Sequence, residues 1–379
     1  MKRRGTFWAS VVAVNLILAA AGAFAAPAKV GTTADRLGYE YVGAHPLAPN
    51  CPHTIFCYRV LVPVALERVA LPAPLRWRVF AAAANATTGV LLAAVAVTAG
   101  AGGVGALIAS VLFQTSFGAT FALFDPFTPD PAVFLAAALI ALAWLRSWPL
   151  MALVVGLVGV FAKETVAVVL TAAALAAWFH RRHASPVEWF VAAGLTWLVV
   201  LGWHLGLDRL AGDSAAGSGS ADLAGGAWLG RWLADTTLTP STRLLYVFIP
   251  FAFAWLYAPL AIPHAPMRLR YLALGALIAL PGLIYVQTME RALSTAAFVV
   301  VPLAAIFLGR LPPALGIAAA VTNGLLTARV GLSTAWLPPV PYLLALAAIV
   351  AVVAIARGLA GARLASTATF SASRVASSK

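Results

Sequence analysis

Residues 31–67 read GTTADRLGYEYVGAHPLAPNCPHTIFCYRVLVPVALE and differ in character from the rest of the chain. Acids, tyrosines, histidines and both cysteines stand here between runs of apolar residues. The stretch follows an apolar run that begins after the basic residues 2–4 and ends near Ala26. The positive-inside rule places the stretch outside the cytoplasm. We therefore expect the chemistry of the protein in this first external loop, residues 31–78.

Cys51 and Cys57 are the only cysteines of the chain. On an exported face, two thiols this close in sequence can form a disulfide that closes a short loop. Two unpaired thiols are the alternative. We predict the disulfide, because the charge pattern puts this loop in an oxidising compartment.

The composition excludes an ordinary soluble domain. Of the 379 residues, 62% are hydrophobic and 10% are charged, whereas roughly a quarter of the residues of soluble domains are charged. The net charge of +13 comes from basic residues scattered at segment ends, which is typical of topology determinants rather than of nucleic-acid binding. Zinc, Walker and dinucleotide motifs are absent from the sequence. The composition therefore predicts a polytopic protein of the lipid bilayer.

The N-terminal 26 residues allow two interpretations. A basic start, an apolar core and Ala23-Phe24-Ala25 before Ala26 also describe a cleavable signal peptide. We favour a retained helix, because an apolar run of about 20 residues is long enough to span a bilayer. Both interpretations export the loop that follows.

Residues 58–71, YRVLVPVALERVAL, are apolar but short and include Arg59, Glu67 and Arg68. Spanning the bilayer would bury these charges, so we expect an amphipathic helix on the outer membrane surface. A second external loop, residues 208–243, is rich in small residues, and the tail 366–379 is expected to be disordered.

The remaining apolar segments predict an all-α membrane protein with about 12 transmembrane helices (11 to 13), both termini cytoplasmic and one transmembrane domain over residues 1–379. After the first helix, the expected spans are residues 80–98, 104–123, 131–145, 149–162, 165–179, 189–207, 244–262, 271–286, 292–308, 314–327 and 341–355.

Charges that were not used to define the spans agree with this layout. Basic residues at 146, 180–183, 268, 270, 310 and in the C-terminal tail fall on the cytoplasmic side, as the positive-inside rule requires. Every acid except Glu188 falls outside. The external face is thus acidic, where a reaction could use carboxylates.

Asp35 is the first candidate catalytic residue, with Glu40 five residues later, although solvated loop acids are common. The next acids stand in FDPFTPDP, residues 124–131, where prolines fix the backbone around Asp125 and Asp130. Capping of the following helix is the alternative explanation for Asp130.

Lys163-Glu164 interrupts a long apolar run, which indicates either a functional site or a charged hairpin turn. Glu290-Arg291 is a second external charge pair, for which a salt-bridged cap is the alternative. Arg59, after Tyr58, could clamp a phosphate through its planar guanidinium, or extend to the membrane surface.

An external acid soon after the first helix, a surface helix before the second span and further external acids resemble the GT-C superfamily of integral membrane glycosyltransferases. The segment 58–63 and Lys163-Glu164-Thr165 look like uncharacterised bacterial branches of that superfamily. The resemblance implies transfer of a hexose or pentose from a polyprenyl-phosphate donor at the extracytoplasmic face of a bacterial cytoplasmic (inner) membrane. It implies Asp35 as general base, with Asp125 assisting or holding Mg²⁺ or Mn²⁺. The chain lacks Asp-x-Asp and a large C-terminal soluble domain.

Such a reaction needs a base at the acceptor hydroxyl and cations at the leaving phosphate. For substrate and phosphate binding the candidates are Glu40, Tyr58, Arg59, Lys163, Glu164 and Arg291. A polytopic transporter or flippase is an alternative, but its charges would be expected near the membrane midplane. A polysaccharide polymerase or ligase of the cell envelope, and a non-catalytic assembly protein, are further alternatives.

Overall fold

A computed structural model describes residues 2–27, 34–47, 56–181, 185–211, 239–285 and 289–377, and within these ranges the chain forms helices and turns without a strand. The first half contains α1 (Lys2–Ala25), α2 (Ala34–Ala44), α3 (Leu61–Glu67), α4 (Ala73–Thr98), α5 (Gly103–Gln114), α6 (Phe117–Phe124), α7 (Asp130–Arg146), α8 (Pro149–Gly159), α9 (Thr165–Phe179) and α10 (Pro186–Ala211). The second half contains α13 (Pro240–Phe248), α14 (Ala254–Ala261), η1 (Ile262–His264), α15 (Met267–Ala279), η2 (Leu280–Tyr285), α16 (Met289–Leu293), η3 (Ser294–Ala296), α17 (Ala297–Leu308), α18 (Pro313–Gly331) and α19 (Val340–Ser377).

Six segments of the described chain are long and apolar enough to cross a membrane, or seven if the bent pair α5–α6 is one span. The six are Gly5–Ala25, Ala73–Thr98, Pro186–Leu207, Met289–Leu308, Pro313–Gly331 and Val340–Gly361. The expected class, a helical membrane protein, is confirmed. The expected count of about twelve is not confirmed, because α8, α9, α14 and α15 are shorter than a full span.

Prolines set the start of several helices. A proline occupies one of the first two positions of α4, α7, α8, α13 and α18. The first N–H groups of a helix have no partner within it, so the N–H that proline lacks is not missed there. The positions at which these helices begin determine where the short connections between helices lie, and with them the charged residues of those connections.

Two expected continuous spans are broken. The segment 104–123 divides into α5 and α6 with a bend of 43°, and 244–262 divides into α13 and α14. The backbone groups freed at the breaks find partners on α18, where Asn323 Oδ1 accepts from the N–H of Phe253 at 2.8 Å and Thr327 Oγ1 donates to the carbonyl of Thr115 at 2.6 Å. Such compensation is what non-helical backbone inside a membrane requires.

The α16–α17 segment forms the centre of the bundle, since Met289–Leu308 is almost entirely buried. α1 joins the bundle through a buried polar contact: Asn15 Nδ2 donates to Ser110 Oγ at 2.8 Å, and Gln114 Nε2 donates to Asn15 Oδ1 at 2.9 Å. Gly89 leaves room for the Asn15 amide, because a Cβ there would lie 1.8 Å from Asn15 Oδ1.

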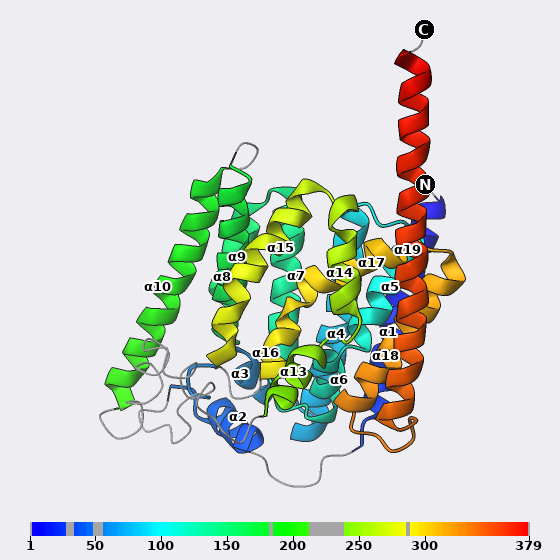
Figure 1. The fold of residues 1–379 in the computed structure, drawn as a ribbon. Helices are drawn as coiled ribbons and strands as arrows, with labels where there is room; N and C mark the ends of the chain where they lie inside the picture. Colours follow the sequence, from blue (N-terminus) through cyan, green and yellow to red (C-terminus); the bar gives the residue numbers. More distant parts are fainter. Residues whose placement is uncertain are drawn as a thin grey trace.

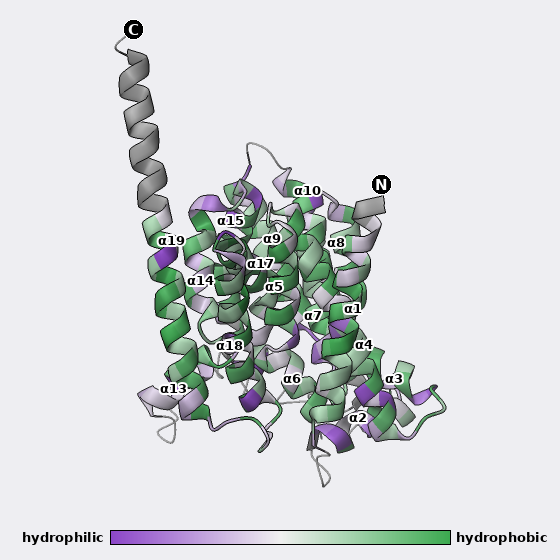
Figure 2. Cartoon of the chain, turned by 90° about the vertical axis from the view of Figure 1, so that its right-hand side faces the viewer, coloured by the Kyte–Doolittle hydropathy of each residue, from purple (hydrophilic) through white to green (hydrophobic). Residues whose placement is uncertain are grey.

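Figure 1 shows α2 and α3 together at the end of the bundle opposite to the end where α1 begins. Figure 2 shows apolar residues along the length of the bundle and hydrophilic residues gathered towards its two ends, as expected for a protein immersed in lipid. The two termini of the described chain, at α1 and α19, lie at the same end (Figure 1).

The first loop departs from expectation in two ways. Residues 34–44 form helix α2, which was not predicted, and the expected surface helix over 58–71 is reduced to α3. Both pack into the protein through a hydrophobic cluster of Tyr39, Val42, Phe56, Val62, Leu66, Trp77, Phe127 and Ala162. Burial of these side chains, rather than contact with lipid alone, therefore holds the first loop in place.

The C-terminal tail also differs from expectation. α19 continues as a helix to Ser377, where disorder was predicted from residue 366. The tail contains neither glycine nor proline after Gly361, so nothing in it interrupts a helix that has already started.

Candidate active site

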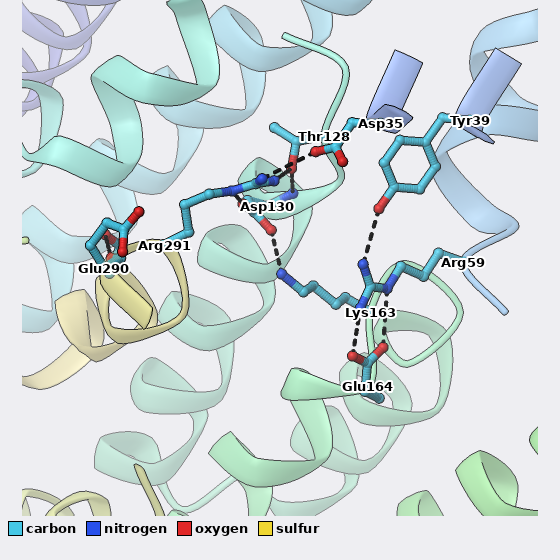
Figure 3. Close-up of polar contacts among 10 residues, drawn as sticks. Asp35, Tyr39, Arg59, Thr128, Asp130, Lys163, Glu164, Glu290 and Arg291 are labelled. Atoms are coloured by element: carbon cyan, nitrogen blue, oxygen red, sulfur yellow. Dashed lines mark hydrogen bonds and ion pairs between the residues drawn. The ribbon is translucent and has the colours of Figure 1, made fainter. Parts of the chain in front are cut away.

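Charged side chains from five parts of the chain meet beside α2 and α3. They come from α2, the segment before α3, the start of α7, the α8–α9 turn and α16, as Figure 3 shows. We call Asp35, Arg59, Asp130, Lys163, Glu164 and Arg291 the charged cluster. The cluster contains three acids and three bases, so its formal charges cancel.

Arg291 joins the two halves of the chain. Its Nε donates to Asp130 Oδ2 at 3.0 Å, its Nη2 to Thr128 Oγ1 at 2.8 Å and its Nη1 to Asp35 Oδ2 at 3.1 Å. The guanidinium carbon lies 5.2 Å from the centre of the Phe121 ring. All three guanidinium nitrogens thus have an acceptor, and the ring covers one face of the plane.

Asp130 connects Arg291 to Lys163. Lys163 Nζ lies 2.7 Å from Asp130 Oδ1, and both side chains are almost fully buried, at 6% and 7% exposure. Burial lowers the pKa of Lys163, and the Asp130 carboxylate opposes this shift. The two cations flank one carboxylate, so Asp130, Lys163 and Arg291 together carry one net positive charge, which Asp35 balances.

Arg59 and Glu164 form a separate two-point pair. Arg59 Nη2 lies 2.7 Å from Glu164 Oε1, and Arg59 Nε donates to Glu164 Oε2 at 3.2 Å. Arg59 Nη1 also donates to the Tyr39 hydroxyl at 3.2 Å. Burial alone would raise the pKa of Glu164, but Arg59 and then Lys163 lower it to about 2, whereas burial raises the pKa of Tyr39 to about 12. Glu164 is therefore ionised and Tyr39 neutral at neutral pH.

The local sequence explains why Asp130 is held so firmly. Pro129 and Pro131 flank it, and the Asp130 N–H donates to Thr128 Oγ1 at 3.2 Å. The same hydroxyl accepts from Arg291. Prolines fix the backbone, and Thr128 fixes both the start of α7 and the arginine, so the carboxylate of Asp130 has a defined position between its two cations.

Five of the candidate residues lie together in the structure: Asp35, Arg59, Lys163, Glu164 and Arg291 all belong to the charged cluster. Asp125 is not one of the six residues of the charged cluster. It is buried at the end of α6, where its backbone N–H donates to the carbonyl of Phe121.

Glu40 and Tyr58 have other partners. Glu40 pairs with Arg36 one turn earlier on α2, with 3.1 Å between Arg36 Nε and Glu40 Oε1. The Tyr58 ring stacks on His204 of α10, with ring centres 3.8 Å apart. Cys57 takes part in a disulfide; Cys51, the only other cysteine, lies outside the described residues.

Sequence reasoning did not assign a site role to Asp130, although it lies between Lys163 and Arg291. Helix capping explained this acid equally well, because aspartate is common at helix starts. The signal that could have distinguished Asp130 is the presence of two cationic side chains on the same face. An acid that lies between two lysine or arginine side chains is kept ionised and forms an ion pair with both. Glu290 was paired with Arg291 in the sequence, yet Arg291 pairs with Asp35 and Asp130 instead.

The cluster does not suit the divalent metal that the resemblance implies. Among the described residues, no three His, Cys, Asp or Glu side chains gather as a metal site would require. Both oxygens of Asp130 and Oδ2 of Asp35 already accept from Lys163 or Arg291. Asp125, to which the resemblance assigns the metal, is not a member of the cluster. The comparisons with known proteins add nothing to this site, since no family model, curated protein or solved structure matches the chain.

Proposed function

We propose that this protein is a membrane glycosyltransferase of the GT-C type. It transfers a sugar from a polyprenyl-phosphate donor to an acceptor at the extracytoplasmic face, and the charged cluster is its active site. The proposal rests mainly on one observation: the acid of the first external loop, Asp35, forms an ion pair with a buried cationic group assembled from distant parts of the chain.

The three acids of the cluster differ in the exposed fraction of their side chains. The Asp35 side chain is 26% exposed, whereas Asp130 and Glu164 are 7% and 8% exposed. A general base has to reach the proton that it removes. Asp35 meets this condition best of the three, and Asp130 and Glu164 hold the cations in position.

The reaction breaks the bond between the sugar C1 and the phosphate oxygen, and its electron pair leaves with polyprenyl phosphate. The acceptor oxygen forms the new bond to C1, and its proton moves to the Asp35 carboxylate. Arg291 stands next to Asp35 and stabilises the charge that develops on the leaving phosphate. Lys163 and Arg59, each held by a carboxylate, maintain the positive field around it.

The membrane layout follows from the same elements. We propose that the chain crosses a bacterial inner membrane about twelve times, with both termini cytoplasmic and α2 and α3 on the outside. α8 and α9 contain 11 and 15 residues, which is about 16 and 22 Å at 1.5 Å per residue, less than the roughly 30 Å of hydrocarbon. The turn with Lys163 and Glu164 would then lie below the outer surface, deeper than the phosphates of the lipid headgroups.

The test uses purified full-length protein in proteoliposomes with radiolabelled undecaprenyl-phosphate hexoses and pentoses and a solubilised cell-envelope glycan as acceptor. The expected result is movement of label from lipid to glycan with release of undecaprenyl phosphate. Empty liposomes are the control. Label that crosses the bilayer while still on the lipid would favour the flippase alternative, and label that stays in place with every donor would contradict the proposal.

A further inference from the structure

The ion pair between Asp35 and Arg291 has a different character from the other pairs of the cluster. Asp130 accepts from both Lys163 and Arg291, and Glu164 accepts two hydrogen bonds from Arg59. Within the described part of the chain Asp35, in contrast, makes one ion-pair contact, at 3.1 Å, and it is the most exposed of the three acids. It is therefore the acid that a competing anion can replace most easily.

The position of the Arg291 guanidinium does not depend on its contact with Asp35. Asp130 and Thr128 hold Arg291 Nε and Nη2, and the Phe121 ring covers the guanidinium. Without Asp35, Arg291 would keep its orientation, and Nη1 would be left without the carboxylate that it contacts. The group of Asp130, Lys163 and Arg291 would then carry one uncompensated positive charge in a largely buried setting, which favours binding of an anion.

We propose that Arg291 Nη1 is the binding position for the phosphate of the lipid carrier, and that Asp35 occupies this position until the phosphate displaces it. This inference rests on the proposed function and adds to it a coupling between donor binding and base release. In the resting protein Asp35 Oδ2 is held by Arg291 Nη1. When the phosphate oxygen takes its place on Arg291, the Asp35 carboxylate becomes free to accept the proton of the acceptor.

The proposed exchange and a simple role of Asp35 in donor binding predict opposite effects of Asp35→Asn on phosphate binding. If Asp35 competes with phosphate for Arg291, Asp35→Asn should strengthen phosphate binding, because a neutral amide competes poorly with a phosphate for a guanidinium. If Asp35 contributed to donor binding, the same change would weaken it. Asp35→Asn is a conservative change at a partly exposed position, so the bundle should fold.

The experiment measures binding of undecaprenyl phosphate to the purified full-length chain by native mass spectrometry, with undecaprenol and inorganic phosphate as separate probes. We expect Asp35→Asn to bind undecaprenyl phosphate about tenfold more tightly than the unchanged protein. Glu188→Gln, which neutralises an exposed acid of α10, should leave the affinity unchanged. Undecaprenol should bind equally to all three proteins, and excess inorganic phosphate should displace undecaprenyl phosphate from Asp35→Asn.

Equal or weaker binding of undecaprenyl phosphate by Asp35→Asn would overturn the exchange, and so would equally tightened binding of undecaprenol. The result of this binding experiment can be distinguished from the result of the sugar-transfer test of the proposed function. Sugar transfer without the affinity change would remove the exchange alone. The affinity change without sugar transfer would keep the phosphate position and remove the glycosyltransferase.

Discussion

At the scale of single residues, the charged cluster shows how ionised groups can be kept inside a membrane protein. Each buried charge has an opposite partner within 3.2 Å, and the acids and bases cancel. Removing a fully buried partner, such as Asp130 or Glu164, leaves an uncompensated buried charge, which typically costs about 3–5 kcal/mol, whereas Asp35 is 26% exposed. The cluster is therefore both a candidate reaction site and a condition for the fold around it.

The ion pair between Arg59 and Glu164 leads us to predict that the fold becomes less stable at acid pH. Burial alone would raise the pKa of Glu164, but Arg59 and then Lys163 lower it from 4.5 to about 2. A carboxyl group whose folded pKa is below its unfolded value stabilises the fold above the unfolded pKa, and this contribution is lost as the pH falls towards the folded pKa. The melting temperature in detergent should thus fall between about pH 5 and pH 2.

Glu164→Gln should lower the melting temperature at pH 7 and make its decline below pH 5 shallower, because the group that titrates is gone. Glu188→Gln, an exposed acid on α10, serves as the control and should keep the slope of the unchanged protein. Equal slopes for Glu164→Gln and the unchanged protein would show that this pair does not carry the pH dependence.

At the scale of helices, close packing of α9 against α15 holds the Lys163–Glu164 turn near the rest of the cluster. Gly275 of α15 touches α9 so closely that a Cβ would lie 2.1 Å from the carbonyl oxygen of Ala172. That neighbour is backbone and cannot turn away. The two helices would have to separate to admit any side chain.

Gly275→Ala is therefore expected to destabilise the protein by roughly 1–3 kcal/mol, the usual range for an overpacked contact. Gly194→Ala on α10 is the matched control, since a Cβ there meets nothing within 4 Å. It should be neutral or stabilising by up to about 1 kcal/mol, because alanine favours a helix. The comparison uses reversible or kinetic unfolding in the same detergent, and equal effects of the two changes would contradict this packing.

At the scale of the whole molecule, apolar composition and charge asymmetry predicted the class of the protein and the end at which its acids gather. They could not predict α2, because the turn-forming residues around 31–57 resemble a loop and helix α2 is stabilised by tertiary burial of Tyr39 and Val42. Lys163 was recognised as an anomaly of the apolar pattern. Its partner Asp130 could not be assigned, because the contact joins residues 33 positions apart and depends on how α7 and α9 pack.

The orientation in the membrane is a prediction for the whole chain. In a protein with Cys51 and Cys57 replaced by serine, a cysteine at Ser185 should react with membrane-impermeant maleimide only after the membrane is opened. A cysteine at Thr239 should react in intact cells. Both positions are exposed. The reverse pattern would invert the layout and place the charged cluster on the cytoplasmic side, which would contradict the proposed reaction.

The most direct test of the central claim is the turnover number of Asp35→Asn with a polyprenyl-phosphate sugar that the unchanged protein uses. A positioned general base contributes roughly 10²- to 10⁴-fold to the rate. We expect a loss of turnover in this range, with donor binding no weaker than in the unchanged protein and with Glu188→Gln at the rate of the unchanged protein. Turnover of Asp35→Asn within about twofold of the unchanged protein, far less than that contribution, would contradict the assignment of Asp35 as the base and with it the active site described for this chain.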